Sequence, residues 1–452
     1  MTATARVVLG SAIGNIVEWY DFGLYGLLAP VLASLFFPSH DRIAALLGVY
    51  GGFAVGFAMR PIGAIVLGRV GDRQGRQFVL VLSVVLMGTA TVAIGLLPSY
   101  AAVGIWAPIL LISIRLFQGF SVGGEFVGSV TYLVESAPEH RRGIAGSVAN
   151  VGATAGMLLA AAAGTLAEAH AARFSQLWRV PFLFGGVLAF AGYLLRRHLP
   201  PEKVAFSHPG AEKSIAEKSR PRNSAPAASR ARLFGSLIAR WPVLQAFRDM
   251  PRTMAIAMLF TCGYGISNYL IMVFLPTFGR EFANIRESSA LRINTAGQAL
   301  ALLMVPLAGW VSDRWIRRRT MLAAAFLLQA GVAWALFGVI THAGAEGLWA
   351  AQLLLAGLLA LVMGAAPAML AEQFPGGYRV SGHAVVLNVG IGIAGGTAPM
   401  VAVALIAATA NSLAPAAYLT AACGISGIAA LLLKDRSRAE LAGETVSAAS
   451  RK

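Results

Sequence analysis

Twelve long apolar stretches restrict what this chain can fold into more than any other feature of the sequence. A helix needs about 20 apolar residues to cross the hydrocarbon core of a bilayer, where only helices and closed barrels satisfy their own backbone. The stretches cover residues 12–37, 43–67, 78–97, 104–134, 144–167, 177–196, 253–277, 290–311, 320–341, 347–371, 382–408 and 413–433. Charged residues make up 12% of the chain, against about a quarter in soluble proteins. The pattern predicts an all-α integral membrane protein with twelve transmembrane helices.

The apolar stretches fall into two groups of six, separated by a polar segment. We expect residues 1–196 to form an N-terminal six-helix bundle and residues 253–434 a C-terminal one. Residues 197–252 are rich in Ser, Ala, Pro, Lys and Arg without sustained periodicity, which is typical of a flexible linker. Residues 435–452 form a short tail. The first apolar stretch is too long for a signal peptide, so we expect it to remain as the first helix.

Positive charge is distributed unevenly along the chain. The net charge is +16, and Lys and Arg gather in the segments after the even-numbered apolar stretches, including the linker. This is the positive-inside pattern of multi-pass membrane proteins, and it differs from the basic face of a nucleic-acid-binding domain. We therefore expect cytoplasmic N and C termini, a bacterial-type inner membrane, contact with the lipid bilayer and no nucleic-acid partner.

The sequence carries none of the motifs that would indicate an enzyme or a metalloprotein. Cys262 and Cys423 lie inside apolar stretches, and their spacing fits neither a disulfide framework nor a metal site. Nucleophile–base motifs, nucleotide-binding loops and metal-ligand clusters are also missing from the sequence. We expect no enzyme activity, no metal and no cofactor.

Two charged motifs occur once in each half of the chain. "GRVGDRQGRQ" (68–77) resembles "GWVSDRWIRRR" (309–319), and "ESAPEHRRG" (135–143) resembles "EQFPGGYR" (372–379), at nearly the same offset. Such an echo predicts a duplicated six-helix unit, related by an axis along the membrane normal. The motifs would act as charged latches that gate the cytoplasmic ends of the helices, the alternative being solvated loops. The gating candidates are Gly68, Asp72, Arg73, Gly75, Arg76, Glu135, Arg142, Asp313, Arg314, Arg317, Glu372 and Arg379.

The first of these motifs, G-x-x-x-D-R-x-G-R at 68–76, resembles the signature loop of the major facilitator superfamily. Arg115-x-x-Gln118-Gly119-x-x-x-Gly123 resembles a second motif of that superfamily. The strings "GNIVEWYDF", "GIWAPILL", "QGFSVGGEF" and "GGTAPM" are similar to the metabolite:proton symporter family, which includes permeases for 2-oxoglutarate, citrate, shikimate, proline and betaine. The resemblance implies the major facilitator fold, with two pseudo-symmetric six-helix halves. "DRWIRRR" lacks the second glycine of the loop, so we expect a weaker latch in the second half.

Two acids interrupt the first apolar stretch. Glu18 and Asp21 are three residues apart and share a helix face, and a charge at mid-membrane costs about 2.5–3.5 kcal/mol on insertion scales. The family resemblance implies that Asp21 pairs with Arg115 of the fourth helix and exchanges a proton; the alternative is a static ion pair. Glu18 is a second proton-coupling candidate, or a solvated residue near the cytoplasmic interface. Glu125 is either a further relay acid or a partner of the 68–76 loop.

Other polar residues in the apolar stretches are candidates for substrate binding. They are Tyr25, Arg60, Gln118, Tyr264, Asn268 and Gln298. Arg60 could attract a carboxylate, or extend to the lipid headgroups in a structural role. Tyr269 is either a further cavity residue or a lipid-facing interface residue. The helices of the second half carry no acid away from their ends, so proton handling is expected in the first half.

Together these features predict a proton-coupled secondary symporter that imports a small organic acid, a di- or tricarboxylate or a related molecule, by alternating access. An osmolyte symporter of the proline or betaine type is the alternative, and an exporter on the same scaffold is another. The short tail without heptads favours the organic acid, because osmolyte carriers of this family often carry a long C-terminal coiled coil. A transporter-like sensor is less favoured, because no signalling domain is apparent.

Overall fold

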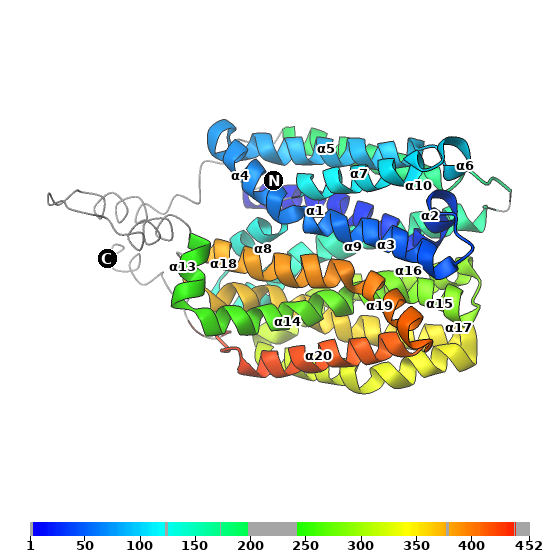
Figure 1. Ribbon diagram of the computed structural model, residues 1–452. Helices are drawn as coiled ribbons and strands as arrows, with labels where there is room; N and C mark the ends of the chain where they lie inside the picture. The colour runs from blue at the N-terminus through cyan, green and yellow to red at the C-terminus, as the bar shows by residue number, and fades with distance from the viewer. Residues whose placement is uncertain are drawn as a thin grey trace, which may run out of the picture.

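The computed structural model describes residues 3–122, 125–171, 173–197, 242–376, 379–437 and 439. Throughout the described residues the regular structure is helical, and no strand occurs in them. The helices run roughly along one axis and form a single bundle (Figure 1). Helices of the first half, in blue and cyan, pack above those of the second half, in green to red. The predicted all-α membrane fold is confirmed.

The first half contains ten helices that contribute to its six predicted spans, together with one 3₁₀ turn, within the residues described. They are α1 (Ala3–Leu27), α2 (Ala29–Phe36), α3 (Arg42–Ala58), α4 (Arg60–Gln74), α5 (Arg76–Leu96), α6 (Tyr100–Val103), α7 (Trp106–Ser121), α8 (Glu125–Glu135), η1 (Glu139–Arg141), α9 (Arg142–Ala169) and α10 (Arg179–Arg197). Several spans are broken near a proline, which cannot donate a backbone hydrogen bond. The α1–α2 pair bends by 63° just before Pro30, and α3 gives way to α4 just before Pro61.

The second half contains long helices interrupted by two π-helical segments. They are α13 (Pro242–Asp249), α14 (Pro251–Tyr269), η2 (Leu270–Phe274), α15 (Leu275–Ala283), α16 (Glu287–Arg314), α17 (Arg318–Gln373), α18 (Arg379–Leu387), η3 (Asn388–Gly395), α19 (Gly396–Thr409) and α20 (Ala414–Leu432). The segments η2 and η3 are π-helical. A π-turn leaves backbone groups without their usual helical partners, and such turns occur frequently at functional sites.

The structure has the twelve membrane spans that the sequence predicts, if the bent α1–α2 pair is counted as one span and α17 as two. Ten helices are long and apolar enough to cross a membrane, and the bent α1–α2 pair makes eleven. The 56 residues of α17 would extend about 84 Å if straight, far more than the roughly 30 Å of a bilayer core. The chain reverses at Gly344 instead, so that Arg318 at one end of α17 reaches Glu372 at the other. Thus α17 is two antiparallel spans, which gives twelve.

The predicted linker is partly helical. Its last residues contain α13, and α14 begins at Pro251, slightly earlier than the predicted start of the second bundle at residue 253. Residues 198–241 of the linker and most of the tail lie outside the described residues. The part of the tail that is described docks on the bundle: Lys434 O accepts a hydrogen bond from Gln373, and Ala439 O accepts one from Arg142.

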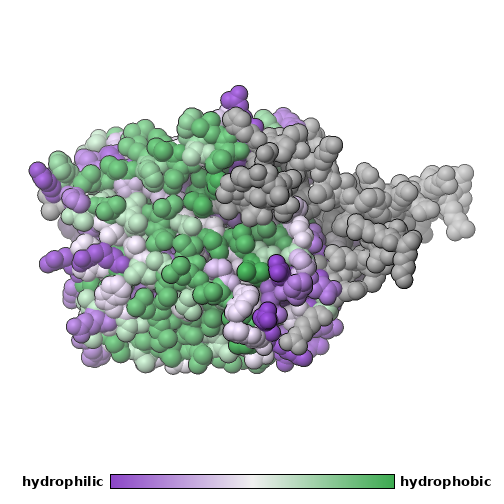
Figure 2. Space-filling model, turned by 180° about the vertical axis from the view of Figure 1, so that it is seen from behind, coloured by the Kyte–Doolittle hydropathy of each residue, from purple (hydrophilic) through white to green (hydrophobic). Residues whose placement is uncertain are grey.

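A broad apolar belt surrounds the bundle. Figure 2 shows hydrophobic residues across the middle of one face, with hydrophilic residues gathered toward both ends of the helices. Large aliphatic and aromatic side chains such as Leu166, Phe190 and Leu303 are more than half exposed there. An apolar surface of this size is unfavourable in water, whereas lipid accommodates it. The protein is therefore a multi-pass membrane protein.

Candidate functional site

A narrow cavity lies between the two halves of the bundle. Its lining comes from α1, α8 and α9 in the first half and from α14, η2, α16, α17 and η3 in the second. The lining residues are Trp19, Phe126, Asn150, Ala153, Thr154, Met157, Tyr264, Asn268, Met272, Gln298, Met363 and Ile391, and none of these is charged. The cavity volume is about 10 Å³, which is room for roughly one water molecule.

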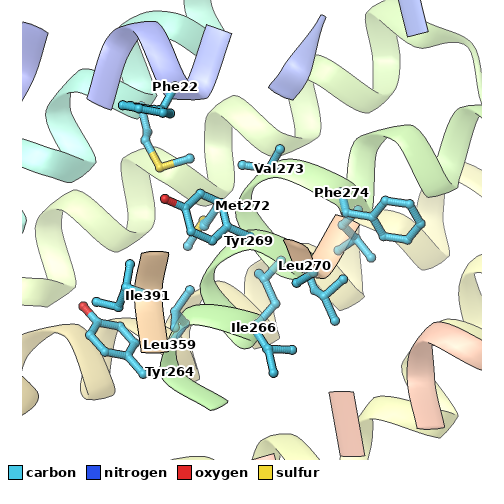
Figure 3. Close-up of a cluster of buried hydrophobic side chains, with 14 of the residues drawn as sticks. Phe22, Tyr264, Ile266, Tyr269, Leu270, Met272, Val273, Phe274, Leu359 and Ile391 are labelled. Atoms are coloured by element: carbon cyan, nitrogen blue, oxygen red, sulfur yellow. The ribbon is translucent and has the colours of Figure 1, made fainter. Parts of the chain in front are cut away.

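Three of the predicted substrate-binding residues lie on the wall of this cavity. Tyr264, Asn268 and Gln298 all contribute to the lining. Figure 3 shows Tyr264 and Tyr269 projecting to the same side of α14, with Ile391 beside Tyr264. Tyr269 is fully buried, so it is not a lipid-facing residue.

The cavity wall also contains residues that the sequence did not indicate as binding candidates. Asn150 of α9 donates to Tyr264 Oη at 3.1 Å and to Met363 O at 2.6 Å, and so connects the two halves. Trp19 follows directly after Glu18 and stacks on Tyr269 with ring centroids 6.2 Å apart. Trp19 Nε1, Asn268 Oδ1 and Tyr269 Oη are buried and have no hydrogen-bond partner in the described part of the chain. These atoms leave two donors and one acceptor available beside the cavity.

Gln298 has a second contact, with the π-helical segment η2. Its Nε2 donates to Met272 O at 3.3 Å, and Asn294 donates to the same carbonyl at 3.1 Å. Gln352 donates to the neighbouring Ile271 O at 3.3 Å. The side-chain amides therefore satisfy carbonyls that the π-turn releases, and they hold the break in the α14–α15 span next to the cavity.

Asp21 lies in a buried cluster inside the first half, where both of its carboxylate oxygens accept hydrogen bonds. Arg115 Nη1 donates to Asp21 Oδ2 at 2.9 Å, and Gln118 Nε2 and Thr91 Oγ1 donate to Oδ1 at 2.6 and 2.7 Å. Asp21 is 1% exposed, and Arg115, Gln118 and Thr91 are equally buried. The Arg115 guanidinium also lies 4.3 Å from the centroid of the Tyr25 ring. Two predicted substrate-binding residues, Tyr25 and Gln118, thus belong to the Asp21 cluster and not to the cavity wall.

Glu18 lies in a second ion pair, which the sequence did not indicate. Arg60 Nη2 is 3.0 Å from Glu18 Oε1, and the two residues are only 7% and 4% exposed. Of the alternatives left open for these residues, an Arg60 that extends to the lipid headgroups and a solvated Glu18 are wrong, because both side chains are buried. The Arg60 guanidinium lies 4.4 and 4.3 Å from the ring centroids of Phe22 and Phe57, within range of a cation–π interaction.

The duplicated motifs meet at one end of the bundle, which we call the motif end. Gly143 N and Ile144 N, in the first turn of α9, donate to the Asp313 carboxylate of the other half at 2.7 and 2.9 Å. A carboxylate is favourable at a helix N-terminus, where backbone donors lack helical partners. Arg379 of the second half donates to Glu135 of the first at 2.7 Å. These contacts close the motif end.

The arginine that completes this closure differs from the one predicted. Arg318 is fully buried, donates to Asp313 at 2.6 Å and pairs with Glu372, which Arg142 approaches at 3.8 Å from the first half. Arg314 and Arg317 are exposed to solvent. The repeat-based assignment of these two residues to the latch is therefore wrong, because α17 begins at Arg318 and turns that side chain inward.

The 68–76 motif is described only in its backbone at most positions. Gly75 joins α4 to α5 with φ of 92°, a conformation that suits glycine. Gly68, Asp72, Arg73 and Arg76 lie in those two helices, and their side chains lie outside the description. The same holds for the side chain of Glu125 at the start of α8. Their predicted roles stay predictions.

The opposite end of the bundle, which we call the far end, is also closed. Arg42 of α3 forms two hydrogen bonds to Glu281 of α15, at 2.9 and 2.7 Å. Tyr50 Oη, on the same helix as Arg42, donates to Thr277 Oγ1 of α15 at 2.9 Å. Since both ends are closed around a cavity of about one water, the structure is an occluded state.

This chain is similar to known transport proteins along most of its length. The family model for "Sugar (and other) transporter" matches residues 7–431. The shikimate transporter of Escherichia coli is 33% identical over 97% of this chain and 96% of its own length. The ectoine/proline transporter ProP of Corynebacterium glutamicum is 30% identical over 96% of this chain and 85% of its own length.

Solved structures show the same fold. The crystal structure of a D-xylose-proton symporter aligns with a TM-score of 0.69 over 98% of this chain and 99% of its own, at 17% identity. The relatives are transporters and not enzymes, and their names favour the proline or betaine alternative over a di- or tricarboxylate. The chain therefore belongs to the sugar (and other) transporter family and has the fold of the major facilitator superfamily.

Proposed function

We propose that this protein is a proton-coupled symporter that imports a small solute with a single carboxylate, either a hydroxylated acid or a zwitterion. The observation that carries the proposal is the cavity between the halves, closed at both ends and lined by neutral polar and aromatic side chains. Such a cavity fits alternating access, in which the halves rock around a central site. We place the motif end in the cytoplasm, following the distribution of Lys and Arg.

The charge balance near the cavity supports a substrate with few carboxylates. Arg60 and Arg115 are buried cations near the cavity, and each is already paired with an acid of α1. A di- or tricarboxylate would bring two or three charges into a site where buried charge needs a partner. A single carboxylate can displace one acid, and the aromatic rings of Trp19 and Tyr264 can face a quaternary ammonium group.

Uptake into proteoliposomes tests this function. Purified protein is reconstituted, an inward proton gradient is imposed, and the accumulation of radiolabelled shikimate, L-proline, glycine betaine, 2-oxoglutarate and citrate is compared. We expect accumulation of a compound from the first three, abolished by a protonophore. Accumulation of citrate or 2-oxoglutarate alone would contradict the proposed substrate class, and uptake that ignores the proton gradient would contradict symport. An exporter coupled to proton entry would instead deplete the lumen of substrate.

A further inference from the structure

The two ion pairs on α1 differ in how completely their carboxylates are bonded. Asp21 accepts directed hydrogen bonds from three side chains, at 2.6 to 2.9 Å. The Glu18–Arg60 pair is close but poorly directed. Glu18 Oε1 has no hydrogen-bond partner in the described residues. Arg60 Nε and Nη2 also have none there, but the same two atoms of Arg115 are equally unpartnered, so the difference between the pairs lies in their carboxylates. Hydrogen bonds to a carboxylate stabilise its charged form, so protonating Asp21 breaks up three good bonds, while protonating Glu18 disrupts one incomplete contact.

The two pairs also differ in which half of the protein surrounds them. The partners of Asp21 lie on α5 and α7, inside the first half. The Glu18–Arg60 pair lies nearer to the second half: Phe57 is 4.3 Å from the Arg60 guanidinium and contacts Tyr269 with ring centroids 5.3 Å apart. Phe53 also contacts Tyr269, at 5.6 Å, but it is 5.7 Å from the Arg115 guanidinium. Rocking changes contacts between the halves and preserves those within a half. The environment of Glu18 therefore changes during the cycle, while that of Asp21 stays largely constant.

Tyr269 connects the Glu18–Arg60 pair to the cavity. Its ring stacks on Trp19, which lines the cavity, and it also contacts Phe57, whose ring lies 4.3 Å from the Arg60 guanidinium. Separation of the stacked Trp19–Tyr269 rings would open a path from the cavity to Arg60.

We propose that Glu18, not Asp21, binds and releases the coupling proton, and that the carboxylate of the substrate competes with Glu18 for Arg60. This assignment rests on the proposed function of proton symport. The substrate carboxylate replaces Glu18 at the two unpartnered nitrogen atoms of Arg60, and Glu18 takes up one proton and becomes neutral. Arg196 of α10 is the other cation that acts on Glu18, and it remains in place through its bond to Leu80 O at 2.8 Å. The Asp21–Arg115 pair then serves as a static ion pair that holds α1, α5 and α7 together.

Infrared spectroscopy tests the assignment without any substrate. The carbonyl band of protonated carboxylic acids is recorded for the purified full-length protein during a pH titration, in the wild type, Glu18→Gln and Asp21→Asn. We expect a titrating component that disappears in Glu18→Gln and persists in Asp21→Asn. A component that persists in Glu18→Gln, or that disappears in Asp21→Asn, overturns the assignment. Glu18→Asp keeps an acid at this position and should retain the component with an altered midpoint, which excludes a mere loss of folding.

Transport provides the second measurement. Glu18→Gln should retain counterflow exchange of the compound that the wild type accumulates, but its accumulation ratio under a proton gradient should fall to unity. Its exchange rate should also lose the pH dependence of the wild type. Uphill uptake by Glu18→Gln would overturn the proposal. A wild type without gradient-driven uptake would contradict the proposed function instead, while the infrared result would still identify the acid that titrates.

Discussion

The carboxylate of Asp21 and the guanidinium of Arg115 are both out of contact with solvent, and each depends on the other for compensation of its charge. Removing one member of a buried ion pair costs about 3–5 kcal/mol, because the remaining charge stays buried without a partner. Removing both charges lowers the free energy of unfolding by less, because no unpaired charge then remains buried. The pair should therefore show strong coupling in stability measurements, whatever its role in proton transfer.

We expect Asp21→Asn to lower the free energy of unfolding by about 3–5 kcal/mol and the double variant Asp21→Asn/Arg115→Gln to regain part of that loss. Thermal unfolding in detergent, monitored by circular dichroism, measures both changes. Asp41→Asn is a matched control, since Asp41 caps α3 through Ile43 N and Asn caps a helix equally well. Equal melting temperatures for Asp21→Asn and the wild type would contradict the buried-pair argument.

Sequence reasoning identified some partners in this region and missed others. Asp21 and Arg115 were connected through a family motif, and the structure brings them together. Thr91 was missed because one hydroxyl in an apolar stretch is a weak signal, and Arg60 was not assigned to Glu18. Spacing along a helix shows which residues share a face, whereas the depth and rotation of neighbouring helices depend on packing. That information is absent from a single sequence.

At the scale of helices, the two halves approach each other closely at the motif end, where α9 packs against α16. A Cβ on Gly143 would collide with Ser312 Oγ and Gly309 O, and one on Gly309 would lie 2.8 Å from Gly143 O. The same contact brings the Asp313 carboxylate within reach of the first turn of α9. Closure of the motif end therefore requires two glycines that face each other.

Gly143→Ala and Gly309→Ala should each prevent full closure of the motif end. We expect a longer distance between spin labels placed on α9 and α16 at that end, measured by pulsed electron paramagnetic resonance, and slower transport. Gly331→Ala is the control, because a Cβ at Gly331 of α17 meets no atom within 4 Å. If the two interface variants give the same distance distribution as Gly331→Ala, the close approach does not control closure.

Helix breaks show the limits of prediction at this scale. The boundaries of the long stretches were predictable because a bilayer fixes their length. The π-turns η2 and η3 were not, since they depend on amides such as Gln298 and Gln352 that lie elsewhere in the sequence and bind the released carbonyls. In the sequence, the glycines of "NVGIGIAGG" and "CGYGIS" lie in or near these segments, but glycine alone does not indicate a π-turn.

For the whole molecule, the two closed ends differ in the exposure of their ion pairs. At the motif end Arg318 and its partners are buried, whereas the Arg42 side chain at the far end is 40% exposed. Water and salt screen exposed charges, and an exposed ion pair contributes about 0.2–1 kcal/mol. The far end should therefore open more readily than the motif end, and salt should favour its opening.

Arg42→Gln should shift the population toward the state open at the far end by up to about fivefold, equivalent to roughly 1 kcal/mol. The charge-exchanged variant Arg42→Glu/Glu281→Arg should restore much of the wild-type population. Distance distributions across the far end, recorded at low and high salt, measure the shift. The salt dependence should be lost in Arg42→Gln. A salt effect of the same size in that variant would contradict the role of this ion pair.

Closure of both ends at once has a consequence for the cell that contains the carrier. A file of water molecules through a membrane protein conducts protons quickly and dissipates the gradient that respiration builds. The cavity between the two halves has room for about one water molecule, too few to form such a file by itself, and ion pairs and hydrogen bonds close both ends of the bundle. Copies of the protein in this closed state should therefore not conduct protons across the membrane through a file of water molecules.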